Sequence, residues 1–188
     1  MIRSGGKQTN INGLAFEKLS CNYSRLINSG FEKTTIDASC KNSFYLSKVW
    51  DGKQLYYTSK IGLRHLLLNK FNVKIHKQPD EAYLIQDIDG LSVPKLFIIE
   101  KKFQNVHGSV DEKLLACDGI RQMYSQVIGK HASVEYIFCL SDYYKNLFEI
   151  NPTEKYTLIK KIIEGYNVKI LYGQDSDYFE KLNNLLVK

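Results

Sequence analysis

The sequence predicts an α/β fold, namely one domain in which a central mixed β-sheet is flanked by helices. Short apolar runs with strand character, at 81–87, 95–104 and 133–141, alternate with segments of helical periodicity. Such alternation is typical of sheets that carry helices on both faces. The 188 residues, of which 44% are hydrophobic, suffice for a sizeable core. No stretch resembles a linker, so we expect a single domain over residues 1–188, with residues 1–10 as a flexible arm.

The first third of the chain predicts two helices separated by a hairpin. Residues 13–28 carry an apolar stripe at helical spacing, formed by Ala15, Phe16, Leu19, Tyr23, Leu26 and Ile27. Residues 43–59 contain two strand-like runs around Asp51-Gly52, a pair of residues that favours a tight reversal. Residues 60–71 follow as a short amphipathic helix.

The central stretch from Lys77 to Gln104 predicts two strands joined by a tight turn, around which the other elements are arranged. The strand at 81–87 follows Asp80, the turn contains Asp89-Gly90, and the second strand begins after Pro94. Because side chains alternate along a strand, Glu100, Lys102 and Gln104 share one face of this second strand.

The remaining elements alternate between helix and strand. Ser109-x-x-Glu112 is a capping box, so a helix is expected to begin at Ser109, with Asp111 and Glu112 in its first turn. The elements predicted after it are a strand at 133–141, a break at Asn151-Pro152, a helix at 153–165, a strand at 167–172 and a helix at 176–187.

One motif stands out in the central stretch. Pro79-Asp80 is followed, after nineteen residues, by Glu100-Lys101-Lys102. This pattern resembles the PD-(D/E)XK nuclease superfamily, the restriction-endonuclease-like group, and is most similar to a type II restriction enzyme. Gln104 extends the pattern to E-x-K-x-Q. The resemblance implies that the sheet and its flanking helices have the restriction-endonuclease-like arrangement.

The resemblance also implies a metal-dependent cleavage site. Asp80 and Glu100 would hold Mg²⁺, for which Mn²⁺ is expected to substitute, and the backbone carbonyl of Lys101 would complete the protein ligands. Lys102 would orient or deprotonate the attacking water. In addition, Gly13, Phe16 and Glu17 resemble the first-helix element of the superfamily, which makes Glu17 a third acid at the metal site.

Structural alternatives exist for each of these residues. Asp80 and Glu100 can instead be acids at a sheet edge that pair with Lys77 or Lys102, since short motifs match by chance. Glu17 can be a solvated acid on the surface of its helix.

The charge of the chain favours a polyanionic partner. The formal net charge is +6, which fits duplex DNA but equally an anionic membrane surface. Lys7, Gln104, His107 and Ser109 are the candidate DNA contacts; for residues 1–12 a frayed terminus is the alternative to a DNA-contacting arm. The hairpin at 43–59 either lies against DNA or simply extends the sheet.

The resemblance, together with the positive charge, implies a Mg²⁺-dependent endonuclease that acts on duplex DNA as a homodimer. The alternatives are a structure-selective repair or homing nuclease of the same fold, and a DNA-binding module without catalysis. The sequence contains no G-x-x-x-x-G-K-[ST] motif and no zinc-type spacing of cysteine or histidine. Without a signal region or a bilayer-length apolar run, we expect a cytoplasmic protein with reduced cysteines and no membrane partner.

Overall fold

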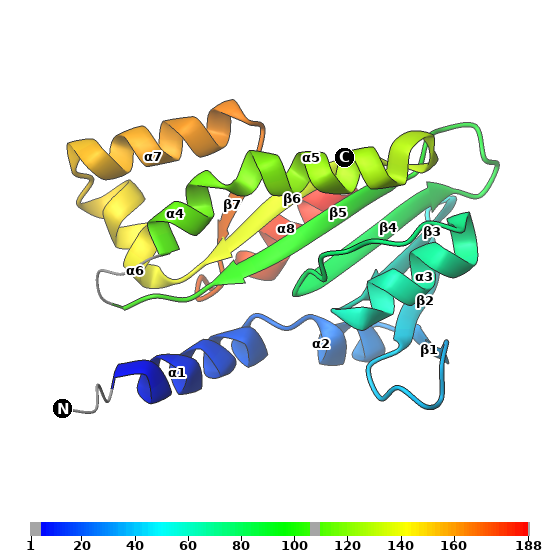
Figure 1. The fold of residues 1–188 in the computed structure, drawn as a ribbon. Coiled ribbons are helices and arrows are strands. Elements are labelled where there is room, and N and C mark those ends of the chain that lie inside the picture. Colours follow the sequence, from blue (N-terminus) through cyan, green and yellow to red (C-terminus); the bar gives the residue numbers. More distant parts are fainter. Residues whose placement is uncertain (1–4, 106–109, 188) are drawn as a thin grey trace. The chain divides into compact units, whose positions relative to one another are not determined.

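The computed structural model describes residues 5–105 and 110–187, with side chains from Ile11 onward. Its helices are α1 (Gly5–Leu19), α2 (Tyr23–Asn28), α3 (Ile61–Phe71), α4 (Val110–Leu115), α5 (Cys117–Ile128), α6 (Asp142–Lys145), α7 (Glu154–Gly165) and α8 (Tyr178–Leu186) (Figure 1). Its strands are β1 (Glu32–Thr35), β2 (Phe44–Trp50), β3 (Lys53–Thr58), β4 (Glu81–Asp87), β5 (Lys95–Lys102), β6 (Ser133–Leu140) and β7 (Lys169–Tyr172).

The strands form a mixed sheet, which confirms the predicted α/β class. In the described residues it has seven strands in the order β1-β2-β3-β4-β5-β6-β7. Neighbours from β1 to β5 pair in antiparallel fashion, whereas β6 and β7 are parallel. The parallel pair requires a long crossover, and α6 and α7 lie in the intervening chain.

Contacts between residues divide the chain into two compact units. The first unit comprises the described residues of 1–21, 101–118 and 137–188, and the second comprises 22–100 and 119–136. One boundary falls inside β5, between Glu100 and Lys101, and another inside β6, between Tyr136 and Ile137.

Most predicted elements are confirmed. The hairpin at 43–59 is β2 and β3, and both Asp51 and Gly52 have the positive φ that its reversal requires. The helix at 60–71, the two central strands, the strand at 133–141 and the last three predicted elements are also present. Asp111 and Glu112 lie in the first turn of α4, as expected.

The single helix predicted over 13–28 is wrong. The chain forms α1 and α2 instead, separated by residues 20–22. The N–H of Asn22 is donated to the Glu81 carboxylate at 3.2 Å rather than to a helical carbonyl. A tertiary hydrogen bond therefore overrides the apolar periodicity that continues through the break. The strand β1 was not predicted, because its four residues are all exposed and show no apolar alternation.

The second unit is built on β4, which is buried on both faces. Residues 81–85 are all buried, as expected for a strand that has neighbours on both sides and helices or strands packed over it. The α3 helix contributes Leu63, Leu66 and Leu67 to the core. Each such side chain contributes about 1.5–3 kcal/mol by its removal from water.

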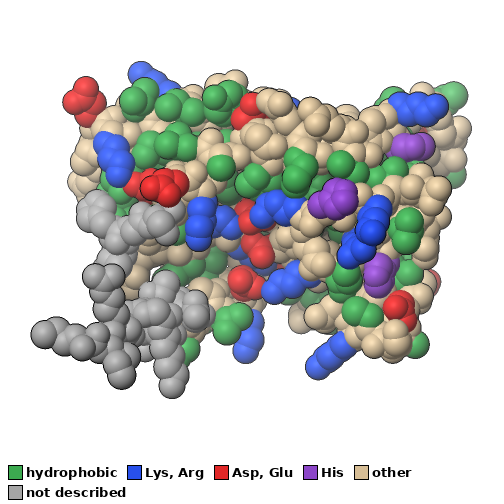
Figure 2. Space-filling model, in the orientation of Figure 1, with side chains coloured by type: hydrophobic (Ala, Val, Ile, Leu, Met, Phe, Trp, Pro, Cys, Tyr) green, Lys and Arg blue, Asp and Glu red, His purple; other side chains and the backbone are tan. Residues whose placement is uncertain are grey.

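The surface mixes charge types. Figure 2 shows Lys and Arg side chains interspersed with acidic, histidine and hydrophobic side chains on the face that it presents. Within the described residues, no helix combines the length and the apolar character needed to cross a membrane. Cys21, Cys40, Cys117 and Cys139 form no disulfide in the described part of the chain.

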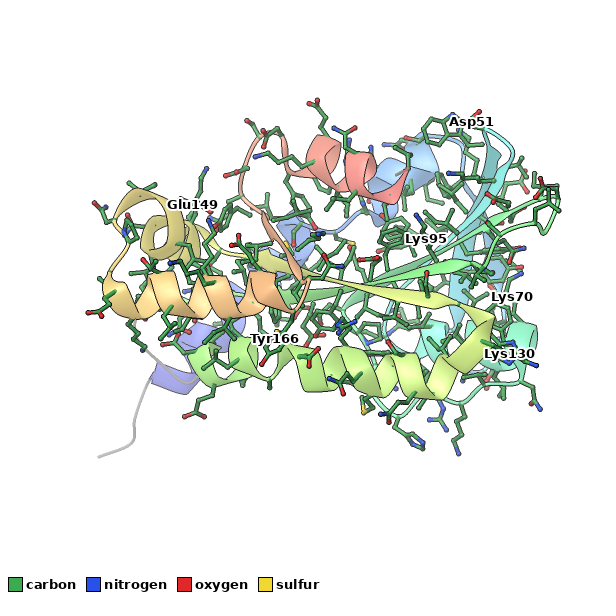
Figure 3. All side chains as sticks on the ribbon, turned by 90° about the horizontal axis from the view of Figure 1, so that it is seen from above. Asp51, Lys70, Lys95, Lys130, Glu149 and Tyr166 are labelled. Carbon is green, nitrogen blue, oxygen red and sulfur yellow. The ribbon has the colours of Figure 1, made fainter. Side chains whose placement is uncertain are left out.

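Tyr56 and Tyr57 of β3 both make side-chain contacts inside the second unit. Lys70, labelled near the end of α3 in Figure 3, donates a hydrogen bond to the Tyr56 hydroxyl at 2.8 Å and lies over its ring. Tyr57 is 1% exposed and donates to Glu81 at 2.8 Å. β3 pairs with both β2 and β4, so the hairpin extends the sheet, and contact of the hairpin with DNA stays a prediction.

A tight contact at the start of α3 predicts a stability effect. A methyl group on Gly62 would lie 2.2 Å from the Thr58 hydroxyl and 2.6 Å from the carbonyl oxygen of Phe44. Gly62→Ala is therefore expected to lower the free energy of unfolding by about 1–3 kcal/mol, because the backbone must shift to admit the methyl group. Urea unfolding followed by circular dichroism measures the change.

Gly119→Ala in α5 is the matched control. Apart from its chain neighbours and the backbone of its own helix, no atom lies within 4 Å of the added methyl group there, and alanine in a helix is favoured over glycine by about 0.5–1 kcal/mol. Equal effects of the two substitutions would contradict the packing described for α3.

Candidate active site

The β4–β5 hairpin brings Asp80 and Glu100 together in the second unit. The antiparallel register pairs Glu81 with Ile99. Asp80 precedes Glu81 and Glu100 follows Ile99, so the next step of the same register places the two acids opposite each other. Opposite residues of an antiparallel pair project to the same face of the sheet. Two carboxylates separated by nineteen residues in the sequence thus become neighbours.

The Glu100 carboxylate is almost completely buried. Glu100 is 7% exposed, whereas Asp80 is half-buried. The ammonium group of Lys77 lies 3.5 Å from Glu100 Oε1. A buried carboxylate requires such a partner, because removing an unpaired charge from water is costly. Pairing of an acid with Lys77 is one of the structural alternatives for the motif. That alternative also expected a sheet edge, whereas β4 and β5 are interior strands.

Tyr124 joins this cluster from α5. Its side chain is 1% exposed, and its hydroxyl donates a hydrogen bond to the Lys77 carbonyl oxygen at 2.9 Å. Burial raises the pKa of the Tyr124 phenol well above its ordinary value, and the charges of Glu100 and Asp80 raise that pKa further. Both carboxylates therefore influence the same hydroxyl electrostatically. We name Lys77, Asp80, Glu100 and Tyr124 the carboxylate cluster.

The sequence did not identify Tyr124 as part of this cluster. The residue lies on the buried side of α5, four residues before the buried Ile128. That spacing predicts a core aromatic residue and carries no information about which strand the helix covers.

Glu81, the residue after Asp80, has a structural role. It is 2% exposed and accepts hydrogen bonds from the Tyr57 hydroxyl at 2.8 Å and the Asn22 N–H at 3.2 Å. Because side chains alternate along β4, Glu81 points to the face opposite that of Asp80. Its carboxylate ties the start of α2 to the middle of the sheet within the second unit.

Three more predicted residues lie in the first unit. The buried Lys101 donates a hydrogen bond from its ammonium group to the backbone carbonyl of Glu17, at 3.2 Å. Lys102, at the end of β5, donates to the carbonyl of Lys101, at 3.3 Å. The carbonyl expected to be a metal ligand is therefore in contact with the lysine expected to be catalytic. Glu17 is half-buried on α1.

Gln104 is held inside the first unit. It is 6% exposed, and its side-chain carbonyl lies 2.9 Å from the Tyr144 hydroxyl. Its backbone N–H donates to the Ser141 hydroxyl at 3.2 Å, and that hydroxyl donates back to the Gln104 carbonyl at 2.8 Å. Of the other candidate DNA contacts, Lys7 belongs to α1, with its side chain outside the described part. His107 and Ser109 both lie outside the described residues.

The donor set of the carboxylate cluster fits Mg²⁺. Across residues 5–105 and 110–187, the structure shows no group of three or more His, Cys, Asp and Glu side chains that could hold a metal, so the fit depends on the pair Asp80 and Glu100. Mg²⁺ is commonly bound through one or two carboxylates, with water and substrate phosphate as the other ligands. The pair meets that requirement without a dedicated cage of protein ligands.

Comparisons of the chain with family models, with curated proteins and with solved structures return no match.

The burial of the Tyr124 hydroxyl predicts how stability depends on pH. In the folded protein the pKa of the Tyr124 phenol is raised. A tyrosine in the unfolded chain titrates at about pH 10. Below that pH both states keep the proton, so the contribution of the Tyr124 hydroxyl is fully present. Above it the unfolded state loses its proton first, and this favours unfolding. The native protein should therefore lose stability as the pH rises beyond about 10.

Tyr124→Phe isolates this effect. At pH 8 the variant should be less stable by about 1 kcal/mol, because the hydrogen bond to Lys77 is lost. This difference should shrink at alkaline pH, because phenylalanine has no proton to lose. Urea unfolding at both pH values measures it, with Tyr166→Phe, at the 41% exposed Tyr166, as control. A stability difference between wild type and Tyr124→Phe that does not change with pH would contradict the prediction.

Proposed function

We propose that the chain is a Mg²⁺-dependent endonuclease that hydrolyses phosphodiester bonds in duplex DNA, with a restriction-endonuclease-like fold. The observation that carries the proposal is the carboxylate cluster. Asp80, directly before β4, lies opposite the nearly buried Glu100 of β5, and the charges of both acids raise the pKa of the Tyr124 hydroxyl. A structural ion pair requires one acid, whereas a divalent cation favours two.

The proposed mechanism assigns a separate task to each residue. Asp80 and Glu100 would hold the cation, with the Lys101 carbonyl as a further oxygen donor. Bound there, Mg²⁺ would supply Lewis-acid stabilisation of the phosphate charge and lower the pKa of a bound water. Lys102 would orient the attacking water and offset the phosphate charge through its ammonium group, or accept the proton of that water as a neutral amine. Glu17 remains the proposed third acid, as an outer group that positions the others.

The proposed substrate follows from charge. Duplex DNA is a dense polyanion, and the net charge of +6 favours its association. Cleavage in this superfamily leaves a 5′-phosphate and a 3′-hydroxyl. A palindromic target would call for a homodimer, since the two-fold symmetry of the protein would match that of the site. The proposed compartment is the cytoplasm.

The Lys77–Glu100 ion pair favours a second candidate function. A lysine that already neutralises Glu100 makes a metal unnecessary for stability, as in a DNA-binding module without catalysis. Metal titration separates the two candidates, because the catalytic proposal requires wild-type protein to bind Mn²⁺ or Mg²⁺ and the other does not.

Substitution of either acid should abolish cleavage. Asp80→Asn and Glu100→Gln keep the size of each side chain but remove a metal-binding charge, so the cleavage rate should fall on the order of 100-fold or more. The assay incubates purified protein with phage-sized duplex DNA and Mg²⁺, beside a sample with EDTA. Mn²⁺ binding, followed by water proton relaxation, should weaken in parallel.

Glu32→Gln on the exposed β1 strand is the control for charge, and urea unfolding verifies that each variant is folded. Wild-type rates in either Asp80→Asn or Glu100→Gln would refute the site. If the wild-type protein cuts no duplex, branched and single-stranded DNA are tested next. Cleavage of those substrates would mean a structure-selective nuclease of the same fold.

Substitutions of Lys102 and Lys101 should have different effects on cleavage and on stability. Lys102→Met is expected to remove cleavage while metal binding persists, because the ammonium group acts on water or phosphate rather than on the ion. Lys101→Met should act mainly on stability, because its ammonium group is used by the Glu17 carbonyl. Cleavage rate, Mn²⁺ affinity and urea unfolding are measured for both; loss of cleavage in Lys101→Met with full activity in Lys102→Met would reverse the assignment.

A further inference from the structure

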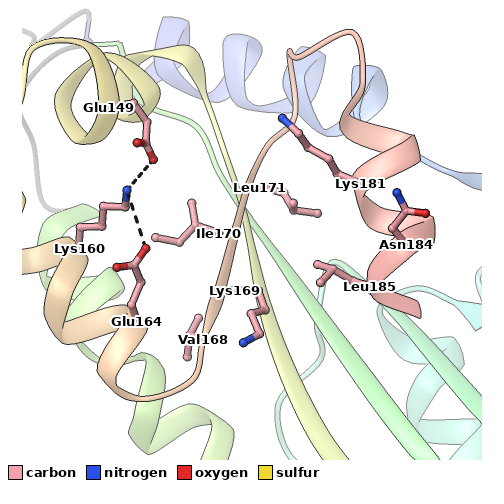
Figure 4. A pocket seen from close by; sticks show the side chains of 10 residues that line it. All are labelled: Glu149, Lys160, Glu164, Val168, Lys169, Ile170, Leu171, Lys181, Asn184 and Leu185. Atoms are coloured by element: carbon pink, nitrogen blue, oxygen red, sulfur yellow. Dashed lines mark hydrogen bonds and ion pairs between the residues drawn. The ribbon is translucent and has the colours of Figure 1, made fainter. Parts of the chain in front are cut away.

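A second feature of the first unit is a pocket beside β7, distant in sequence from the motif. Its volume is about 450 Å³, within the range of ligand sites. The pocket is lined on one side by η2 and α7, in the middle by β7, and on the other side by α8 (Figure 4). Here η2 is the π-helical segment Asn146–Ile150. We call this pocket the β7 groove.

The floor of the β7 groove is an open sheet edge. The order of the described strands ends at β7, which pairs with β6 only. Beyond the strand, the Gly173 N–H continues the ladder by donating to the Leu140 carbonyl at 2.9 Å. Backbone groups alternate in direction along a strand, so Lys169 and Leu171, like Gly173, face β6. The N–H and C=O of Ile170 then point to the other edge, into the groove.

The two walls of the groove differ in charge. Tyr172 lies on the α7 side, since its hydroxyl donates to Glu149 at 2.7 Å. Ile170 shares that side because it alternates with Leu171. Lys160 lies 2.8 Å from Glu149 and 3.8 Å from Glu164, so this wall has two acids and one base.

The Glu149 charge is well stabilised. Its burial works against ionisation, but hydrogen bonds from Lys160 and Tyr172 more than offset that effect and hold the pKa of Glu149 below its ordinary value. Glu149 therefore keeps its negative charge at neutral pH.

The opposite wall is basic. Lys169 and Lys181 line it together with Asn184 and Leu185. Lys181 is ion-paired with Asp177 at 3.0 Å and with Asp175 at 3.5 Å, so nearby acids neutralise its charge. The Lys169 ammonium group instead donates to the side-chain carbonyl of Asn167 at 2.7 Å, which is a neutral partner. Lys169 thus brings a positive charge to the edge strand.

We propose that the β7 groove binds an extended peptide segment of another protein, which adds a strand to β7 and directs acidic side chains toward Lys169. The backbone of Ile170 supplies the pairing groups, and the walls select alternate side chains of the peptide, as in other strand-addition sites. Valine-like residues would contact the half-buried Ile170 on the α7 side. Acidic residues would lie on the α8 side.

A second copy of the chain fits the groove less well. The edge of β7 lies between α7 and α8, which both line the groove. A copy would present the same flanked edge, so helices from both molecules would oppose the approach to the roughly 5 Å that strand pairing requires. A single extended segment is narrow enough to enter. The other sheet edge, β1, differs in that all four of its residues are exposed and two are charged, a pattern that discourages strand addition.

Synthetic peptides test the proposal. The probes are a fluorescein-labelled eight-residue peptide that alternates valine and glutamate, its valine–lysine counterpart, and a valine–glutamate peptide with alternate backbone nitrogens methylated. Fluorescence anisotropy with the full chain should show binding of the first peptide and at least 10-fold weaker binding of the other two, because the lysine peptide opposes Lys169 and methylation removes the pairing N–H groups.

Two variants tie binding to the groove. Ile170→Pro removes the outward N–H but leaves the ladder to β6, which proline at an edge permits, and should weaken binding at least 10-fold. Lys169→Glu should reverse the preference between the glutamate and lysine peptides. Lys161→Glu, at an exposed α7 position outside the groove, makes the same charge change and should not reverse it.

Three outcomes would overturn the proposal. The first is no binding of any peptide at millimolar concentration. The second is unchanged affinity in folded Ile170→Pro, verified by circular dichroism. The third is a dimer in sedimentation velocity that Ile170→Pro dissociates, which would mean that a second copy occupies the edge.

Discussion

A carboxylate that is almost fully removed from water imposes the main constraint on this structure. Glu100 is 7% exposed and follows the four buried apolar residues 96–99 of β5. An isolated charge there would be strongly unfavourable. Lys77 supplies the opposite charge, and Tyr124 fixes the backbone of Lys77 through its carbonyl. Residues close to β4, on β5 and on α5 thus together meet one requirement, which is to stabilise the buried charge of Glu100. A protein that needed only a stable hairpin could have placed an apolar residue at position 100.

Tyrosine hydroxyls recur as partners of carboxylates in both units. Tyr57 donates to Glu81 in the second unit, and in the first Tyr172 donates to Glu149 while Tyr144 lies 3.0 Å from an oxygen of Asp111. A hydrogen bond to an ionised acceptor is about twice as strong as a neutral one. Burial, together with these acids, raises the pKa of Tyr144 and Tyr172, so both phenols keep their protons. Several of the thirteen tyrosines therefore serve as buried, uncharged donors.

The boundary between the two units divides the sequence motif. Glu100 is counted with the second unit and Lys101 with the first, although the two residues are consecutive in β5. The acids with direct structural support, Asp80 and Glu100, belong to one unit. Lys101, Lys102 and Glu17 belong to the other, where Lys101 and Lys102 each donate to a backbone carbonyl. The proposed metal site therefore depends most directly on Asp80 and Glu100. The proposed role of Lys102 depends on β5, which links it to Glu100.

The sequence by itself determined the local elements whose signals lie within a few residues. The apolar runs of β4, β5 and β6, the Asp51-Gly52 and Gly90 reversals and the amphipathic α7 and α8 all follow from propensity and periodicity. It also drew attention to Asp80 and Glu100 through the motif, but only the register of the β4–β5 hairpin places the two residues opposite each other. Tertiary structure decided the rest. The break before Asn22 depends on Glu81, the place of Tyr124 depends on which strands α5 covers, and the β7 groove exists because two helices flank a strand with one free edge. Each depends on contacts between residues far apart in the chain, and local sequence does not specify such contacts.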